Sequence, residues 1–325
     1  MIALFSKSKY ESTTDEVIDW LVFFRGNFIR VNGVDYFRTV TIRNNGFDNG
    51  FFRDIFESAK VCWFRRWVDD DFFDEILESP RLLAESQHIL KNHLNREFSL
   101  ISNELWRQLS DRRWITKPSE VGLRKLEVLD KATKFGLLVP STIVTSSKTE
   151  LIRFKERAGR VITKTIGDIP NFRSGGQAYS MRTVEIDDEI IKYSLRDTFF
   201  PSLFQALIEK EFELRIFFLF DKFYSMAIFS QRDKQTELDF RNYNKNKPNR
   251  ATPFKLPKWL EDKLRALVSD LKLTTGSIDM IRQPLTGDYY LLEINPVGQI
   301  GMTSYPCNYY LEREIAKQLI AYDRE

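Results

Sequence analysis

The chain has 325 residues, of which 42% are hydrophobic and 29% are charged. That length suits two or three packed subdomains, and 14 glycines and 11 prolines are too few for a collagen-like or low-complexity chain. The 49 basic and 46 acidic residues leave a net charge of +3, which argues against a dedicated nucleic-acid binder, and no apolar run reaches the roughly 20 residues of a membrane-spanning helix.

The pattern of residues 1–117 predicts an N-terminal α/β domain. Ile2–Phe5 has the composition of a strand, and Thr13 precedes Glu16 by three residues, which is the spacing of a capping box at the start of a helix. A second strand near Phe28–Val31 completes a β-α-β pattern, which is typical of α/β proteins.

Residues 118–205 predict a second domain, which begins after a linker around Ile115–Val121. Apolar spacing and turn residues predict two helices that alternate with two strands. These elements are a helix at Leu123–Phe135, a strand at Ser141–Val144, a helix at Lys148–Ala158 and a strand at Val161–Lys164.

Residues 206–325 predict a third region built around antiparallel strands. In Glu211–Phe220, polar and apolar residues alternate, so Glu213 and Arg215 are expected on one face and Leu214 on the other. The further predicted elements are a strand at Phe223–Ser230, a helix at Pro257–Leu271, a hairpin of Ser277–Gln283 with Tyr289–Ile294, and a helix at Asn308–Tyr322.

Cysteine and histidine are scarce, which limits the chemistry available to this chain. Cys62 and Cys307 have no CxxC or Cys/His spacing, so a zinc site is not expected. His88 and His93 lie on different faces of a predicted helix, and neither follows an obvious nucleophile. The apolar start lacks a basic leader, so we expect a reduced, cytoplasmic protein whose chemistry depends on carboxylates, cations and bound metal.

The predicted C-terminal hairpin brings oxygen ligands together. Centred on Thr286, it places Asp279 opposite Glu293, and Asn295 shares the face of Glu293. Two carboxylates and an amide oxygen suit Mg²⁺, which also binds substrate phosphates. The alternative is a solvated hairpin face, but the neighbouring residues are apolar, and ionised groups among them need compensation.

Two lysines precede this hairpin at positions that suit a phosphate ligand. Lys125 begins a predicted amphipathic helix, and Lys164 ends a predicted apolar strand. A lysine can act as a point charge toward phosphate. Taken singly, each lysine could equally be a surface residue whose stem covers apolar side chains.

Six segments in chain order carry a resemblance to a known superfamily. They are Lys125-Leu126, GLLVPSTIVT (136–145), VITK (161–164), FQALIEKEFELRIF (204–217), SIDMI (277–281) and LLEINPVGQ (291–299). In this order they resemble the ATP-grasp superfamily, from about Leu123 to the C-terminus. Within it, the ELR at Glu213, the Ser230-Gln231 pair and EINPVGQ resemble the graspetide synthetases, which include the microviridin ligases. The N-terminal pattern and the tail GMTSYPCNYYLEREIA are most similar to the grasp-with-spasm maturases.

The resemblance implies an α/β (α+β) protein with an ATP-grasp fold, in which the N-terminal domain precedes two lobes that grip ATP. It also implies a role for each matching residue. Lys125 and Lys164 would contact the α- and β-phosphates, the hinge of Leu207, Ile208 and Glu209 would meet adenine, and Glu213 would hold the ribose. Arg215 would face the γ-phosphate and the incoming carboxylate, and Mg²⁺ would be bound by Asp279, Glu293 and Asn295. Ser174–Gly176 would belong to a mobile phosphate loop.

The activity implied by the resemblance is ATP-dependent macrocyclisation of a precursor peptide made of a leader and a core. An Asp or Glu side chain would be activated as an acyl phosphate, and a Ser/Thr hydroxyl or Lys amine would close an ester or amide ring. One alternative is an intermolecular ligase that adds an amino acid to a protein or peptide. Another is a non-catalytic module that binds nucleotide or peptide. No nucleic-acid or membrane partner is expected, and a homodimer is compatible with this interpretation.

Overall fold

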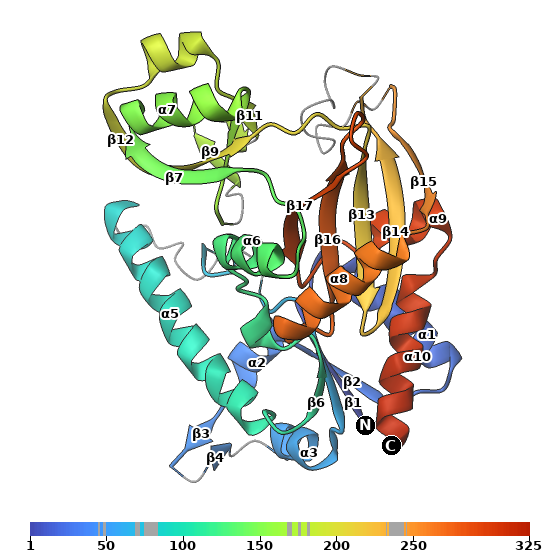
Figure 1. Ribbon diagram of the computed structural model, residues 1–325. Coiled ribbons are helices and arrows are strands. Elements are labelled where there is room, and N and C mark those ends of the chain that lie inside the picture. The colour runs from blue at the N-terminus through green and yellow to red at the C-terminus, as the bar shows by residue number, and fades with distance from the viewer. Residues whose placement is uncertain are drawn as a thin grey trace. The chain divides into compact units, whose positions relative to one another are not determined.

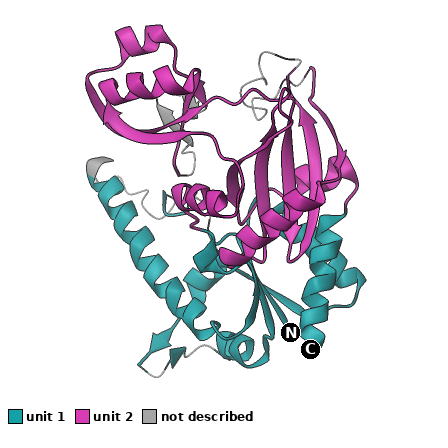
Figure 2. Ribbon diagram, viewed as in Figure 1, with its two compact units in different colours: residues 1–121, 310–325 teal, residues 122–309 magenta. Residues whose placement is uncertain are grey.

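The computed structural model describes residues 1–44, 46–47, 50–68, 72–74, 84–167, 171–174, 177–180, 183–231, 233, 244 and 246–325. The chain forms two compact units (Figure 2). Unit 1 comprises Met1–Val121 and Tyr310–Glu325, and unit 2 comprises Gly122–Tyr309. Each unit has its own hydrophobic core.

Unit 1 is built on a four-stranded parallel sheet with the order β2-β1-β5-β6. Every residue of β1 is buried, as expected for a central strand covered on both faces, and the strand predicted at Ile2–Phe5 is confirmed. The sheet strands are β1 Ile2–Ser6, β2 Phe28–Asn32, β5 Val61–Phe64 and β6 Arg113–Ile115. The helices are α1 Ser12–Phe23, α2 Gly33–Thr39, α3 Gly50–Ser58, α5 Ala84–Gln108 and α10 Leu311–Arg324, with η1 Pro118–Glu120; β3 Ile42–Arg43 pairs with β4 Gly46–Phe47.

The C-terminal helix α10 belongs to unit 1, although the sequence placed it in the third region with the rest of 206–325. Its apolar positions Leu311, Ile315 and Leu319 are fully or almost fully buried, and the helix packs against α1, β1 and β5. The amphipathic spacing of α10 predicts a buried stripe but not what covers it. Only the folded chain shows that the covering surface comes from residues hundreds of positions earlier.

The first lobe of unit 2 is a small antiparallel sheet with the order β11-β8-β12-β7. Leu151 and Phe154 of α7 pack with Val161 and Phe204 to form its core. Its elements are β7 Thr142–Ser147, α7 Lys148–Ala158, β8 Val161–Lys164, β11 Val184–Glu185, η2 Ile190–Ser194 and β12 Thr198–Ala206, with β9 Asn171–Ser174 paired to β10 Gln177–Ser180. Of the predicted phosphate loop, Ser174 ends β9, and Gly175 and Gly176 lie outside the described residues.

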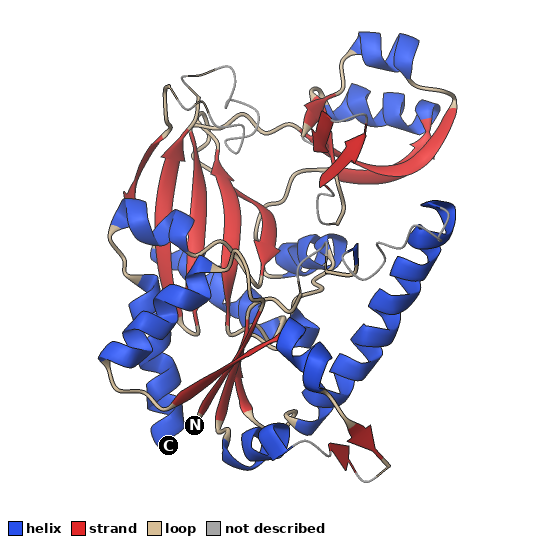
Figure 3. Cartoon of the chain, turned by 180° about the vertical axis from the view of Figure 1, so that it is seen from behind, coloured by secondary structure: helices blue, strands red, loops and turns tan. Residues whose placement is uncertain are grey.

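The second lobe of unit 2 is a five-stranded antiparallel sheet with the order β15-β14-β13-β16-β17, visible from its two sides in Figures 1 and 3. Its strands are β13 Phe212–Leu219, β14 Lys222–Phe229, β15 Arg250–Phe254, β16 Thr275–Arg282 and β17 Tyr289–Asn295. The lobe also holds α6 Lys125–Lys134, α8 Lys258–Asp270 and α9 Gly301–Cys307. One face of β13, which carries Leu214 and Ile216, packs on Leu260 and Leu264 of α8. Because strand side chains alternate, Glu213 and Arg215 lie on the other face.

Within the described ranges, none of the helices combines the length and the apolar character needed to cross a membrane.

Gly33 offers a test of the packing in unit 1. Its N–H donates to the carbonyl oxygen of Trp67 at 3.1 Å, and a Cβ at this position would lie 2.2 Å from that oxygen. Because a backbone carbonyl cannot rotate away, Gly33→Ala should lower the free energy of unfolding by about 2–3 kcal/mol.

The matched control is Gly122→Ala, where an added Cβ meets nothing within 4 Å. That change should stay within about 0.5 kcal/mol of the parent chain in urea unfolding. Equal losses for the two variants would show that the close approach at Gly33 is not a constraint.

Candidate active site

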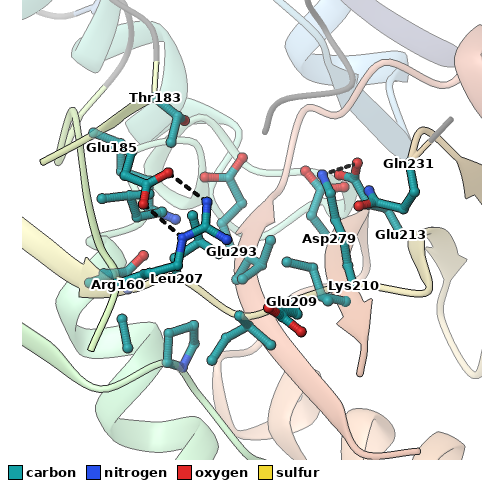
Figure 4. A pocket seen from close by; sticks show the side chains of 18 of the residues that line it. Arg160, Thr183, Glu185, Leu207, Glu209, Lys210, Glu213, Gln231, Asp279 and Glu293 are labelled. Carbon is teal, nitrogen blue, oxygen red and sulfur yellow. Dashed lines mark hydrogen bonds and ion pairs between the residues drawn. The ribbon is translucent and has the colours of Figure 1, made fainter. Parts of the chain in front are cut away.

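A cavity of about 410 Å³ lies within unit 2, between the small sheet and the five-stranded sheet (Figure 4). Side chains from β8, β11, β12, β13, β16 and β17 contribute to its walls, together with the segment that joins β12 to β13. Most of the predicted site residues line it: Lys164, Leu207, Ile208, Glu209, Glu213, Asp279 and Glu293. The fold therefore brings together residues that are more than a hundred positions apart in the sequence.

Strand β8 forms one wall of the cavity because its side chains alternate. Ile162 and Lys164 of β8 line the cavity, as does Arg160 just before the strand, whereas Val161 packs in the core of the first lobe. Arg160 donates from Nε and Nη2 to the two carboxylate oxygens of Glu185 on β11, both at 2.7 Å (Figure 4). A bidentate pair of this kind fixes the guanidinium plane at the edge of the cavity.

The predicted hinge lies between β12 and β13 and is tethered at both ends. The Leu207 N–H donates to the carbonyl oxygen of Arg160 at 2.8 Å, and the Glu211 N–H donates to that of Arg282 at 2.8 Å. Between these bonds, Ile208 and Glu209 line the cavity outside any strand. Since its N–H is already bonded, Leu207 would meet a ligand through its carbonyl or side chain.

Glu213 lies at the centre of a buried hydrogen-bond network. Lys210 Nζ donates to its Oε1 at 2.6 Å, and Ser230 Oγ donates to the same oxygen at 2.8 Å. Gln231 Nε2 donates to Ser230 Oγ at 3.1 Å and extends the network to the cavity wall. Burial raises the pKa of Glu213, and the nearby Asp279 charge acts in the same direction, while Lys210 and Ser230 oppose the rise.

Asp279 and Glu293 lie directly opposite each other on β16 and β17, as the sequence predicted. The pairing depends on an irregularity that the sequence did not reveal. From the hairpin end, Arg282 pairs with Tyr289 and Met280 with Leu291, and the register then shifts so that Leu292 has no direct partner. Such a bulge re-aims the side chains beyond it, and here it aligns the two carboxylates.

Each of the two carboxylates is paired with a cation that the sequence had assigned to phosphate. Arg215 Nη1 contacts Oδ1 and Oδ2 of Asp279, both at 2.7 Å, and the two residues pair across β13 and β16. Lys125 Nζ lies 3.2 Å from Glu293 Oε2 and donates to the Thr165 carbonyl at 3.1 Å. Arg215 and Lys125 are thus connected to the cavity through the carboxylates they contact.

Asn295 ends β17 and is exposed. Its Oδ1 accepts hydrogen bonds from the backbone N–H groups of Val297 at 3.1 Å and Gly298 at 2.9 Å, so it stabilises the turn after the strand. Its predicted role as a metal ligand stays a prediction. In the described part of the chain, no group of three or more His, Cys, Asp or Glu side chains could hold a metal. A pair of carboxylates nevertheless suits Mg²⁺, which usually completes its shell with water and substrate phosphates.

The sequence analysis missed several polar residues of the cavity, among them Arg160, Glu185, Gln205 and Lys210. In the sequence, Arg160 and Glu185 are charged residues of the kind found on any protein surface. Only the pairing of β8 with β11 brings them together. Gln205 did leave a signal, because it is a polar residue that directly follows the apolar Leu203 and Phe204, and all three are buried in the structure.

No family model matches this sequence, and a search of the curated proteins found no match either. Solved structures, however, resemble it over almost its whole length. An ATP-grasp ligase associated with ribosomally made peptides, from Chryseobacterium gregarium, is 23% identical, with 98% of this chain and 95% of that chain covered and a TM-score of 0.77. The macrocyclase MdnC from Microcystis aeruginosa MRC is 22% identical, with 99% of both chains covered and a TM-score of 0.77. The ATP-grasp ligase PsnB is 15% identical, with 99% and 97% covered and a TM-score of 0.77.

These similarities establish the fold. The chain has the ATP-grasp fold, with an N-terminal α/β part and two further lobes of mixed α/β structure, and the predicted fold class is confirmed.

The two ion pairs should differ in their effect on stability. Asp279→Asn leaves the Arg215 guanidinium, whose side chain is 8% exposed, without its carboxylate partner, and should cost about 3 kcal/mol of unfolding free energy. The Glu293 side chain is 30% exposed, so Glu293→Gln should cost about 1 kcal/mol or less. Urea unfolding of the two isosteric variants measures both values, and equal losses would contradict this ranking.

The raised pKa of Glu213 predicts a pH-dependent stability. Between the ordinary carboxyl pKa of 4.5 and the raised value, the native chain keeps a proton that the unfolded chain has released. The contribution of this group to unfolding free energy should therefore fall as pH rises through that window. Glu213→Gln cannot titrate at this position. In denaturant titrations, the unfolding free energy of the parent minus that of the variant should therefore decrease as the pH rises. An increase of this quantity with pH would contradict the raised pKa.

Proposed function

We propose that this chain is an ATP-dependent carboxylate ligase that closes macrocycles in a ribosomally made precursor peptide, as a graspetide synthetase does. The observation that carries the proposal is the meeting of the hinge, Lys164, Glu213 and the Asp279–Glu293 pair around one cavity. Such a set can hold a nucleotide at one end and its phosphates with Mg²⁺ at the other.

The structures that share this fold support the substrates. The Chryseobacterium gregarium ligase is in complex with ADP and with a leader and core peptide. MdnC is bound to its precursor peptide MdnA, and PsnB is complexed with a minimal precursor, Mg and ADP. A precursor peptide and ATP with Mg²⁺ are therefore the substrates we propose for this chain.

The residues of the cavity divide between the parts of the nucleotide. The apolar side chains of Ile162, Leu207 and Leu292 can enclose a flat base, while the buried Glu213 carboxylate can accept hydrogen bonds from ribose hydroxyls. Lys164 lines the cavity and can meet a phosphate as a point charge, and Lys125 can do so beside Glu293.

The chemistry requires two anions, the peptide carboxylate and the triphosphate, to approach each other. When bound, Mg²⁺ neutralises phosphate charge and orients the transferred phosphoryl group. Asp279 and Glu293 would hold it, and Arg215, already aligned by Asp279, would face the carboxylate and the γ-phosphate. The peptide carboxylate attacks the γ-phosphorus, ADP leaves, and a hydroxyl or amine of the same peptide displaces phosphate from the acyl phosphate.

This sequence of steps needs no cysteine nucleophile, and the cysteines are unsuited to be one. Both are buried, and burial raises the pKa of Cys62 to about 12 and that of Cys307 to about 11. A thiol is reactive as the thiolate, so these side chains stay inert near neutral pH. We place the protein in the cytoplasm, where cysteines remain reduced; a homodimer stays a prediction.

The test is incubation with ATP, Mg²⁺ and a Ser/Thr- and Asp/Glu-containing peptide encoded beside the gene. Each ring should lower the peptide mass by one water and release one ADP. Glu293→Gln should abolish the mass change while the chain remains folded, because it removes a carboxylate that would hold Mg²⁺.

The other outcomes identify the alternatives. A gain in peptide mass would indicate an intermolecular ligase that adds an amino acid. Nucleotide binding without ADP release, in the presence of the correct precursor, would indicate a non-catalytic module.

A further inference from the structure

One buried polar group of the cavity is not used by the function proposed above. Gln205 lies on β12, opposite Thr142 of β7 and Ile162 of β8. The residue is 1% exposed and lines the cavity. A glutamine buried in a strand needs partners for both ends of its amide.

The orientation of the Gln205 amide follows from its neighbour. Thr142 Oγ1 donates its own hydrogen to the Pro140 carbonyl at 2.7 Å, so toward Gln205 this oxygen can only accept. Gln205 Nε2 donates to it at 2.9 Å. The nitrogen therefore faces Thr142, and a flipped amide would place two acceptors against each other.

Gln205 Oε1 is the end that lacks a partner. It is buried and accepts no hydrogen bond from the part of the chain that the structure describes. The apolar residues Ile162, Ala206 and Leu292 line the same cavity, together with the charged and polar residues described above. A buried acceptor without a partner favours a ligand that presents an N–H donor, and disfavours one that presents another acceptor.

We propose that Gln205 Oε1 accepts a hydrogen bond from the exocyclic 6-amino group of adenine, so that Gln205 is a specificity-determining residue for the base. The inference rests on the proposed function, in which the cavity binds ATP. Adenine carries a donor at position 6, whereas guanine carries a carbonyl oxygen there, which would face Oε1 as a second acceptor.

The test compares ATP with purine riboside triphosphate, which is the same molecule without the 6-amino group. Calorimetric titration with Mg²⁺ present should show that the parent chain binds ATP about tenfold more tightly. Gln205→Met keeps the length of the side chain but removes the acceptor, so the ratio of dissociation constants should fall below about twofold. Gln205→Glu retains an acceptor oxygen and should keep the preference for ATP.

Each outcome decides the inference. A Gln205→Met chain that keeps the tenfold ratio overturns it. Equal affinities of the parent chain for the two nucleotides also overturn it, even if the methionine variant does not fold, while leaving the proposed function intact. Failure of both nucleotides to bind the parent chain overturns the proposed function together with this inference.

Discussion

The cavity of unit 2 depends on one electrostatic constraint: two carboxylates must lie side by side in a partly buried place without unfolding the sheet that carries them. Asp279 and Glu293 pair directly across β16 and β17. Like charges in this position destabilise a sheet unless they are compensated. The compensation comes from Arg215, on the strand next to β16, and from Lys125, at the start of α6. Each carboxylate therefore has a cation beside it, and under the proposed function these pairs would exchange partners with a metal and a phosphate.

The same sheet serves stability and chemistry through its two faces. On β13, Leu214 and Ile216 pack against α8, while Glu213 and Arg215 alternate with them on the opposite face. Strand geometry makes this separation possible, because successive side chains point in opposite directions. The polar face is also buried, so its charges persist only as the paired networks of Lys210 with Glu213 and Arg215 with Asp279.

Much of the candidate site could be predicted where local rules apply. The opposition of Asp279 and Glu293 follows from a hairpin with a short loop, and the polar face of β13 follows from alternation. The sequence could not show how Asp279 and Glu293 come to face each other. The loop alone gives a register shifted by one residue, and the bulge at Leu292 corrects it. Nor could it show that Arg215 and Lys125 contact these carboxylates rather than solvent.

The sequence by itself determined several of the strands and helices, the faces of β13 and the two carboxylates that meet across the last hairpin. These features arise from periodicity and short-range spacing, which are local properties of the chain. The tertiary structure alone decided that α10 joins the N-terminal unit, that Arg160 meets Glu185, and that the Gln205 amide is fixed by Thr142 and Pro140. Those contacts depend on which strands pair and which surfaces pack, and no pattern within a single segment encodes them.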